Sequence, residues 1–420
     1  MTDTPLDAGL RKATLRLVPI LLLMYVLAFL DRTNLGFAHD AFRRDTGLSE
    51  AAYALGASLF FAGYAVLEIP SNLILARVGA RRWLARIMVT WGLVSAAMVF
   101  ARSEAVFYGL RLLLGVCEAG FFPGVIWYLT RWYPSSRRAG VLGLFYFGAP
   151  LSFIAGGPLS GALLQMGGLA GLAGWQWLFL IEGALASLVG VAAWFALSDG
   201  PGSAAWLSPD ERAAVTEASG DGPGAETPGA IAAALTRPTV WHFALVYGLI
   251  QMAVYGVVFF LPAQIAALTG RKIGLEVGLV SAVPWLVALV VTAVVPRWCD
   301  RHGHRRGVAA GLLVLAGAGM AGSVALSAPV LAVAALALAA SGFIAVQPLF
   351  WSLAAERLSG TRAAAAIALI NTLGSVGSFL APNLRTAADA GLHHAGAGLY
   401  VLAGLTVTAA ALIAFVRRRA

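Results

Sequence analysis

The chain is 420 residues long, with 60% hydrophobic residues, 12% charged residues and a formal net charge of +9. This composition excludes a soluble globular domain with an ordinary polar surface and predicts a polytopic membrane protein. The excess of basic residues does not indicate a nucleic-acid partner, because these residues fall in short loops between apolar segments, which is the pattern of membrane topology. The lipid bilayer is the expected partner.

Twelve long apolar segments follow one another along the chain. The first six lie near residues 15–38, 52–76, 83–101, 105–130, 139–165 and 175–197, and the second six near 238–268, 274–296, 307–325, 328–355, 363–388 and 396–416. The stretch between the two sets is polar and rich in Gly, Pro and acidic residues, which is typical of a linker. We therefore expect an all-α membrane protein with a six-helix bundle over 1–198, a cytoplasmic loop over 199–236 and a second six-helix bundle over 237–420.

The first apolar segment contains an ionic pair. Its fourteen uncharged residues, 17–30, would extend only roughly 21 Å, whereas the hydrocarbon core of a bilayer is roughly 30 Å thick. A spanning helix must therefore continue through Asp31 and Arg32, and the apolar residues Leu35 and Phe37 beyond them favour this interpretation over a helix that exits before the pair. Ionisable residues inside a membrane are costly and are candidates for a functional site.

The fourth segment also carries two charges, Arg111 and Glu118. They are seven residues apart, so a helix places them on nearly the same face and about 10 Å apart along its axis. We expect this segment to span the membrane, because otherwise the basic residues that follow it near 131–138 would lie outside the cell.

The distribution of basic residues predicts the orientation. Of the 29 lysines and arginines, 21 fall on the side that carries both termini, 6 on the opposite side and 2 within the membrane. By the positive-inside rule, both termini are cytoplasmic and the chain lies in the cell (inner) membrane.

An internal repeat relates the two halves at an offset of 224 residues. Arg77, Gly79, Arg81 and Arg82 recur as Arg301, Gly303, Arg305 and Arg306, and Pro158 recurs as Pro382. Paired six-helix halves are typical of transporters that bind their substrate at mid-membrane and alternate access by rocking of the halves. We expect a gating role for Arg77, Arg81, Arg301 and Arg305, although an ancient duplication with another function stays open.

These residues also carry a family resemblance. RVGARR (77–82) and CDRHGHRR (299–306) resemble the two cytoplasmic signature loops of the major facilitator superfamily. The first departs from the usual Asp-Arg start, because Ala76 precedes Arg77, so an ionic latch there must use other partners. LDRTNLGFA (30–38), EIPSNLILARVGARRW (68–83), RLLLGVCEAGFFPG (111–124) and ALINTLGSVGSFLAP (368–382) resemble the anion:cation symporter family. The resemblance implies twelve transmembrane helices in the major facilitator fold and transport of organic anions such as tartrate, sugar acids or phthalate.

The resemblance also implies residue roles. Asp31 and Glu118 match the carboxylates that are protonated in proton-coupled members, and Arg32 matches the ligand of the substrate carboxylate. The remaining matches are Arg111, a charge partner for Glu118, and Tyr64 and Asn371, which contact polar groups of the substrate. The chemistry is consistent, because the planar guanidinium of Arg holds a carboxylate with two hydrogen bonds, while a carboxyl group near it can be charged or neutral.

Further polar residues are weaker candidates. Tyr247, Gln251 and Tyr255 recur every four residues, so they form either a substrate-lining face or a packing stripe, and we include Tyr247 and Gln251 among the candidate ligands. For Glu182 we expect a structural hydrogen bond to a neighbouring helix rather than a role in coupling. Glu68 is expected near a cytoplasmic helix end, as a gating salt bridge or a solvated charge. The histidines show no metal-ligand spacing, so we expect neither a metal nor a cofactor.

The favoured function is proton-coupled uptake of a small organic carboxylate, such as a sugar acid, tartrate or an aromatic acid, by a monomeric carrier. An exporter or a proton antiporter of another small molecule is the alternative. An integral-membrane enzyme is disfavoured, because the sequence shows no nucleophile motif, metal cluster or phosphate loop that faces one compartment.

Overall fold

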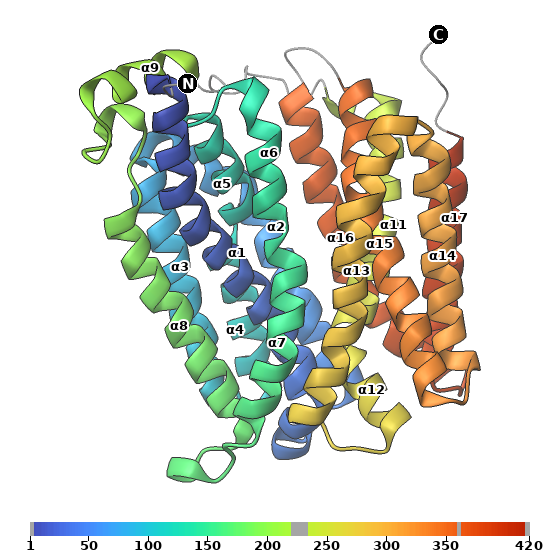
Figure 1. Ribbon diagram of the computed structural model, residues 1–420. Helices are drawn as coiled ribbons and strands as arrows, with labels where there is room; N and C mark the ends of the chain where they lie inside the picture. The colour runs from blue at the N-terminus through green and yellow to red at the C-terminus, as the bar shows by residue number, and fades with distance from the viewer. Residues whose placement is uncertain (1–3, 220–233, 359–362, 416–420) are drawn as a thin grey trace.

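The computed structural model describes residues 4–219, 234–358 and 363–415, and within these ranges the chain forms helices and no β-strand. Figure 1 shows two helix bundles side by side, one built from α1 to α8 and the other from α11 to α17. The short helix α9 (Pro209–Ser219) lies in the connection between them. Part of the predicted linker, 220–233, and the basic residues Arg417 to Arg419 lie outside the described residues. The predicted all-α fold with two bundles is confirmed.

The helices follow the predicted order of segments. The first bundle contains α1 (Pro5–Thr46), α2 (Glu50–Val78), α3 (Ala80–Ala96), α4 (Glu104–Glu118), α5 (Phe121–Thr130), α6 (Ser135–Tyr146), α7 (Gly148–Leu164) and α8 (Gly174–Ala196). The second contains α11 (Pro238–Val258), α12 (Leu261–Thr269), α13 (Leu275–His302), α14 (Arg305–Ala325), α15 (Pro329–Arg357), α16 (Ala363–Gly391) and α17 (Ala397–Ala414). Among the described residues, 11 helical segments are long and apolar enough to cross a membrane, and α16 occupies the place of the remaining predicted span.

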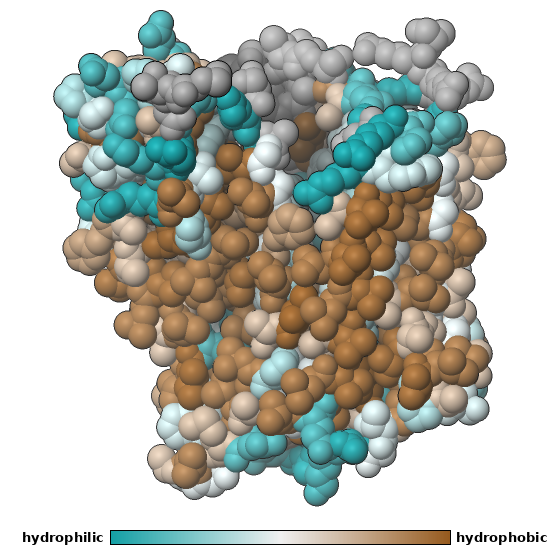
Figure 2. Space-filling view, in the orientation of Figure 1, coloured by the Kyte–Doolittle hydropathy of each residue, from teal (hydrophilic) through white to brown (hydrophobic). Residues whose placement is uncertain are grey.

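The outer surface of the two bundles is that of a membrane protein. Figure 2 shows a broad hydrophobic belt around the middle of the molecule and hydrophilic residues gathered at its two ends. Large apolar side chains such as Phe100, Phe195 and Val290 are exposed instead of packed in the core. In water such a surface would drive aggregation, whereas lipid chains cover it without penalty.

α1 is a continuous helix of 42 residues that passes through Asp31 and Arg32 without a break. Thr4 caps its first turn by accepting a hydrogen bond from the backbone N–H of Asp7 at 3.2 Å. The prediction that the helix continues beyond the ionic pair is therefore confirmed, and the pair lies inside the first bundle.

Three predicted spans consist of two helices each. The fourth is interrupted between α4 and α5, the fifth between α6 and α7 at Phe147, and the seventh between α11 and α12 at Phe259 and Phe260. Gly120 forms the first break with φ +85°, a left-handed conformation that glycine adopts without steric cost. Discontinuous helices are common at the binding sites of transporters, and the first break directly follows Glu118.

The two bundles meet most closely on one side of the molecule. Figure 1 shows the start of α1 and the end of α17 at the same end, which we call the terminus face; the other end is the opposite face. Towards the opposite face, glycines of α7 pack against glycines of α13, so that a Cβ added to Gly157 would strike the carbonyl group of Gly278. Nearby, the Asn383 side chain donates to the Ser58 hydroxyl at 2.8 Å. Small residues allow this close approach of helix backbones.

The repeated basic loops lie on the terminus face. The backbone N–H of Arg81 donates to Asp199 at 3.0 Å and its guanidinium to the carbonyl oxygen of Trp194 at 2.6 Å, both in the first half of the chain. Arg305 donates to Glu356 at 2.6 Å within the second half, while Arg77 and Arg301 are exposed. These contacts hold Arg81 and Arg305 to their own bundles, and the gating role of the four arginines stays a prediction.

Candidate functional site

Arg32 forms the centre of the candidate site, because it connects three helices from both bundles. Its Nη1 donates to the Tyr255 hydroxyl of α11 at 2.9 Å, and its Nη2 forms an ion pair with Glu118 at the end of α4. The side chain of Arg32 retains 13% exposure, whereas that of Glu118 retains 0%. The predicted anion ligand therefore already holds a carboxylate of the protein itself.

Aromatic rings surround the Arg32 guanidinium. Its central carbon lies 4.9 Å from the ring centre of Phe29, 5.2 Å from that of Phe60 and 5.7 Å from that of Tyr64. The rings exclude water and attract the cation through their faces, so the charge persists in an environment of low polarity. The predicted site residue Tyr64 thus lies beside Arg32.

Asp31 points away from Arg32 into the first bundle, because neighbouring residues on a helix project in different directions. The Ser95 hydroxyl of α3 donates to Asp31, and Asn34 donates to the same carboxylate oxygen at 3.2 Å. The second carboxylate oxygen of Asp31 has no hydrogen-bond partner among the described residues. Asp31 therefore lies behind the Arg32 site and does not line it.

Arg111 is predicted to pair with Glu118, but its hydrogen bonds go elsewhere. It donates to the carbonyl oxygens of Gly56 and Ala57 on α2 at 3.3 and 3.4 Å. Two turns of helix separate Arg111 from Glu118, which is too far for a direct bond, and Arg32 of α1 is the bonded partner of Glu118. Arg111 lies buried behind the site, where its charge still influences the surrounding carboxylates.

Asn371 is bonded to a carboxylate from the other bundle. Its side-chain amide donates to Glu68 of α2 at 2.7 Å, and the hydroxyl of the next residue, Thr372, donates to the second oxygen of Glu68 at 2.8 Å. Glu68 is only 4% exposed, so the expectation of a solvated charge is wrong for this residue, while a gating role stays a prediction. It lies one turn after Tyr64 on the same face of α2, and this spacing is the signal that could have placed it in the site.

Two other predicted ligands lie on α11 but differ in their surroundings. The Tyr247 ring packs against the rings of Phe350 at 5.1 Å and Trp351 at 4.9 Å, which favours the packing-stripe alternative for this residue. Gln251 is half-buried, and its side-chain carbonyl oxygen has no hydrogen-bond partner among the described residues. Tyr255, the third member of the stripe, is the residue that contacts Arg32.

Glu182 of α8 lies within the first bundle and accepts a hydrogen bond from Ser160 of α7 at 2.9 Å. The predicted hydrogen bond to a neighbouring helix is therefore confirmed. Glu182 is thereby one of four buried carboxyl groups of the described membrane-spanning helices; the others are Asp31, Glu68 and Glu118. Unpaired charges are costly away from water, so such groups are candidates for proton binding.

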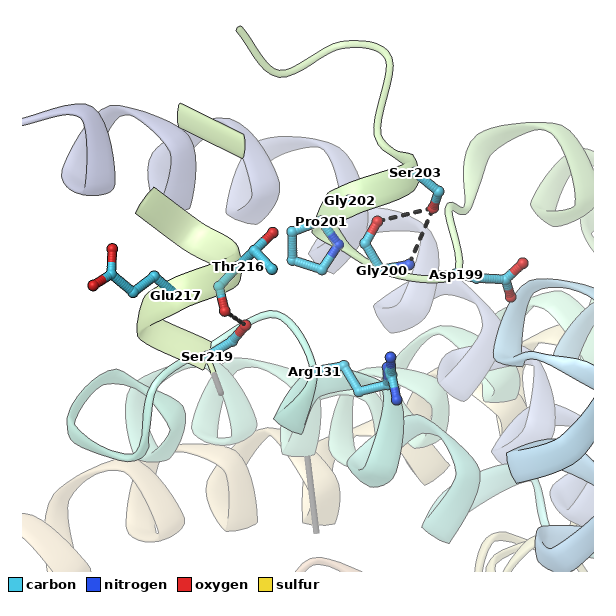
Figure 3. Close-up of a pocket in the computed structure, with 9 residues that line it drawn as sticks. All are labelled: Arg131, Asp199, Gly200, Pro201, Gly202, Ser203, Thr216, Glu217 and Ser219. Atoms are coloured by element: carbon cyan, nitrogen blue, oxygen red, sulfur yellow. Dashed lines mark hydrogen bonds between the residues drawn. The ribbon is translucent and has the colours of Figure 1, made fainter. Parts of the chain in front are cut away.

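The surface pockets lie away from these residues. One, of about 560 Å³, is lined by Arg131 and by residues 199–203 and 216–219 of the connecting region on the terminus face. Figure 3 shows that the Glu217 side chain points away from this pocket and that Ser203 bonds back to Gly200. A second, of about 390 Å³, lies on the opposite face beside Asp40 and Lys272. Neither contains the converging charges of the Arg32 site.

Comparison with known proteins places the chain among membrane transporters. The family model of the Major Facilitator Superfamily matches residues 21–382. The chain is 47% identical to the inner membrane transport protein RhmT of Escherichia coli, over 98% of this chain and 96% of the relative. It is 42% identical to a putative tartrate transporter of Agrobacterium vitis, over 97% and 91% of the two chains. The fold also matches the solved xylose transporter XylE of E. coli with a TM-score of 0.77, at 14% identity and over 96% and 100% of the two chains.

Proposed function

Because the chain belongs to the major facilitator superfamily of membrane transporters, we propose that it takes up a small organic carboxylate together with protons by alternating access. The chain is a transporter and not an enzyme. Carboxylate transport is supported by the largely buried cation Arg32, and the Agrobacterium relative, a putative tartrate transporter, points to the same class of substrate. The proposed substrates are sugar acids, tartrate and aromatic acids.

The observation that carries the proposal is the ion pair between Arg32 and Glu118. Glu118 occupies the Nη2 donor of Arg32, so a substrate carboxylate that binds the guanidinium through Nη2 displaces Glu118, while the Nε–H has no partner among the described residues and offers the substrate a second donor. The released Glu118 is fully buried, and an unpaired buried carboxylate costs several kcal/mol unless it takes up a proton. Binding of the anion and binding of a proton then favour each other, which is the requirement for symport.

The orientation and the conformation form part of the same proposal. The excess of basic residues on the terminus face favours a cytoplasmic location for both termini in the inner membrane. The close contacts between α7 and α13 lie towards the opposite face, which is then periplasmic. In this orientation the described contacts close the periplasmic side of the site, and the rocking of the bundles must exchange them for contacts on the cytoplasmic side.

Uptake into proteoliposomes tests the function. Purified protein in liposomes with an alkaline interior should concentrate at least one acid from a panel of tartrate, gluconate and benzoate above the level reached in protein-free liposomes when the exterior is acidified, and a protonophore should abolish this accumulation. Accumulation driven by an outward proton gradient, with an acidic interior and an alkaline exterior, would instead support the antiport alternative. Absence of any carboxylate transport would contradict the proposal.

A further inference from the structure

We propose that the Glu68 carboxylate occupies part of the substrate site when no substrate is bound. It accepts the hydrogen bonds of Asn371 and Thr372 until an oxygen-bearing group of the substrate replaces it. The inference rests on the proposed function, since it names the part of the substrate that the second bundle binds. It also assigns to Glu68 a place in the transport cycle.

The geometry of Glu68 is that of a bound carboxylate ligand. Each of its two oxygens accepts one hydrogen bond, from the Asn371 amide at 2.7 Å and from the Thr372 hydroxyl at 2.8 Å. Both donors come from α16 in the second bundle, while Glu68 comes from α2 in the first. The side chain is 4% exposed, so water does not compete for these bonds.

The chemistry of the two donors indicates what can replace Glu68. An amide N–H and a hydroxyl are neutral donors. They can donate a hydrogen bond with the same geometry to a carboxylate, a hydroxyl or a carbonyl oxygen. Glu118 is paired with a guanidinium, but no cation forms a hydrogen bond or an ion pair with Glu68 among the described contacts. The exchange of Glu68 for an oxygen group of the substrate therefore preserves the hydrogen bonds of Asn371 and Thr372.

The spacing of the two anchors predicts the shape of the substrate. Tyr64 lies beside Arg32, and Glu68 follows it by four residues, which is about 6 Å along the helix. A molecule bound to Arg32 through one carboxylate therefore reaches Asn371 and Thr372 only with a second oxygen group a few bonds away. The inferred substrate class is a hydroxy acid or a dicarboxylic acid, and a simple alkanoic acid lacks the second anchor.

Release of Glu68 also affects the two bundles. Its hydrogen bonds link α2 to α16, two helices that pack along each other. The substrate that takes over Asn371 and Thr372 replaces this direct link by one that runs from α16 through the substrate to Arg32 of α1. Whether the site is occupied therefore determines whether Glu68 holds the two bundles together directly, and this affects how they rock.

Binding measurements with matched variants test the inference. Dissociation constants for tartrate, gluconate and hexanoate should be measured on purified protein by calorimetry. Glu68→Gln weakens the internal competitor because a neutral amide is a poorer acceptor, so tartrate should bind roughly three- to tenfold more tightly than to the wild type. Thr372→Val removes one donor at constant shape from Glu68 and from the substrate group that replaces it, so the affinity for tartrate and gluconate should change less than in Glu68→Gln, with hexanoate unchanged and Thr372→Ser behaving as the wild type.

A measurement without ligand separates this inference from the proposed function. Spin labels at the exposed positions 77 and 301, one on each bundle, should report a changed distance distribution when Glu68→Gln is introduced. If the wild type transports an acid but Glu68→Gln and Thr372→Val alter neither affinity nor distances, the role of Glu68 is refuted and the proposed function stands. If the wild type transports no carboxylate, the proposed function is refuted, and the distances alone decide whether Glu68 links the bundles.

Discussion

Arg32 has two bonded partners, and they belong to different bundles. Glu118 comes from the first bundle and Tyr255 from the second. The contacts of the guanidinium therefore depend both on the charge of Glu118 and on the relative position of the two bundles. A substrate carboxylate that takes the place of Glu118 would keep Arg32 charged and paired. This arrangement explains why a permanently charged residue is tolerated inside the membrane-spanning helix bundles.

The first prediction concerns the shape of this cation. Arg32→Lys keeps the charge but loses the planar fork, so carboxylate binding should weaken by roughly 10- to 100-fold, the loss expected for one or two charged hydrogen bonds. The dissociation constant of the best acid from the uptake panel provides the measurement. Arg102→Lys, at an exposed position, is the control and should bind normally. Normal affinity in Arg32→Lys would remove this residue from the site.

The second prediction separates the site from the packing on α11. Tyr255→Phe removes only the hydroxyl that accepts from Arg32 at 2.9 Å, so we expect a loss of about 0.5 to 1.5 kcal/mol in substrate binding. Tyr247→Phe, on the same helix, keeps the ring that packs against Phe350 and should leave affinity unchanged. Equal effects of the two substitutions would show that Tyr255 has no special role.

The sequence identifies the charged residues of the site but not the residues that pair with them. Asp31, Arg32 and Glu118 are recognisable because each interrupts an apolar run, whatever the fold. The partner of Glu118 comes from a helix about 90 residues earlier in the chain, and the hydrogen bonds of Asn371 go to Glu68 in the other bundle. Such pairings depend on how helices from distant parts of the chain are arranged, which one sequence without relatives does not contain.

Among the helices, the break between α4 and α5 has the clearest consequence for the site. It ends α4 at Glu118 and thereby places the carboxylate next to a free helix end inside the first bundle. Gly120 makes the turn possible with its positive φ, and a Cβ added to it would strike the Ser71 hydroxyl oxygen on α2. The turn and the packing both depend on the absence of a side chain.

A third prediction follows for this break. Gly120→Ala forces an alanine into the left-handed region, which costs roughly 1 to 2 kcal/mol, and adds a contact with Ser71. The melting temperature of the purified protein in detergent should fall. Gly109→Ala is the matched control, because Gly109 lies within α4 with open space around its Cα, and this variant should be unchanged or slightly more stable. Equal melting temperatures in the two variants would contradict this account of the turn.

The spans themselves are predictable, whereas their breaks are not. A long apolar run predicts a membrane helix because hydrophobic thickness sets its length. The same run hides the interruptions at Phe147 and at Phe259 and Phe260, since those residues are as apolar as their neighbours. Gly120 and Pro262, which lies in the first turn of α12, give local signals, but single glycines and prolines inside apolar segments are common in membrane helices.

For the whole molecule, the arrangement suggests how charge balance and movement are connected. A monoanion that enters a cell with a negative interior is opposed by about 2.3 kcal/mol per 100 mV, so one proton only cancels its charge and two make uptake electrogenic. Asp31 of α1 lies behind the site, and Glu118 at the end of α4 lies within it. We expect both to exchange protons during the cycle, with uptake of a monoanion moving net positive charge inward.

The most direct test compares exchange and accumulation in Glu118→Gln. The neutral amide mimics a protonated Glu118, and its carbonyl oxygen can still accept from Arg32, so binding and counterflow of a carboxylate should persist. Accumulation driven by a pH gradient should be lost, because the residue that couples anion release from Arg32 to proton binding no longer titrates. Both activities should be measured on one proteoliposome preparation. If Glu118→Gln still concentrates the substrate under a pH gradient as the wild type does, the competition between Glu118 and the anion for Arg32 does not couple transport to protons.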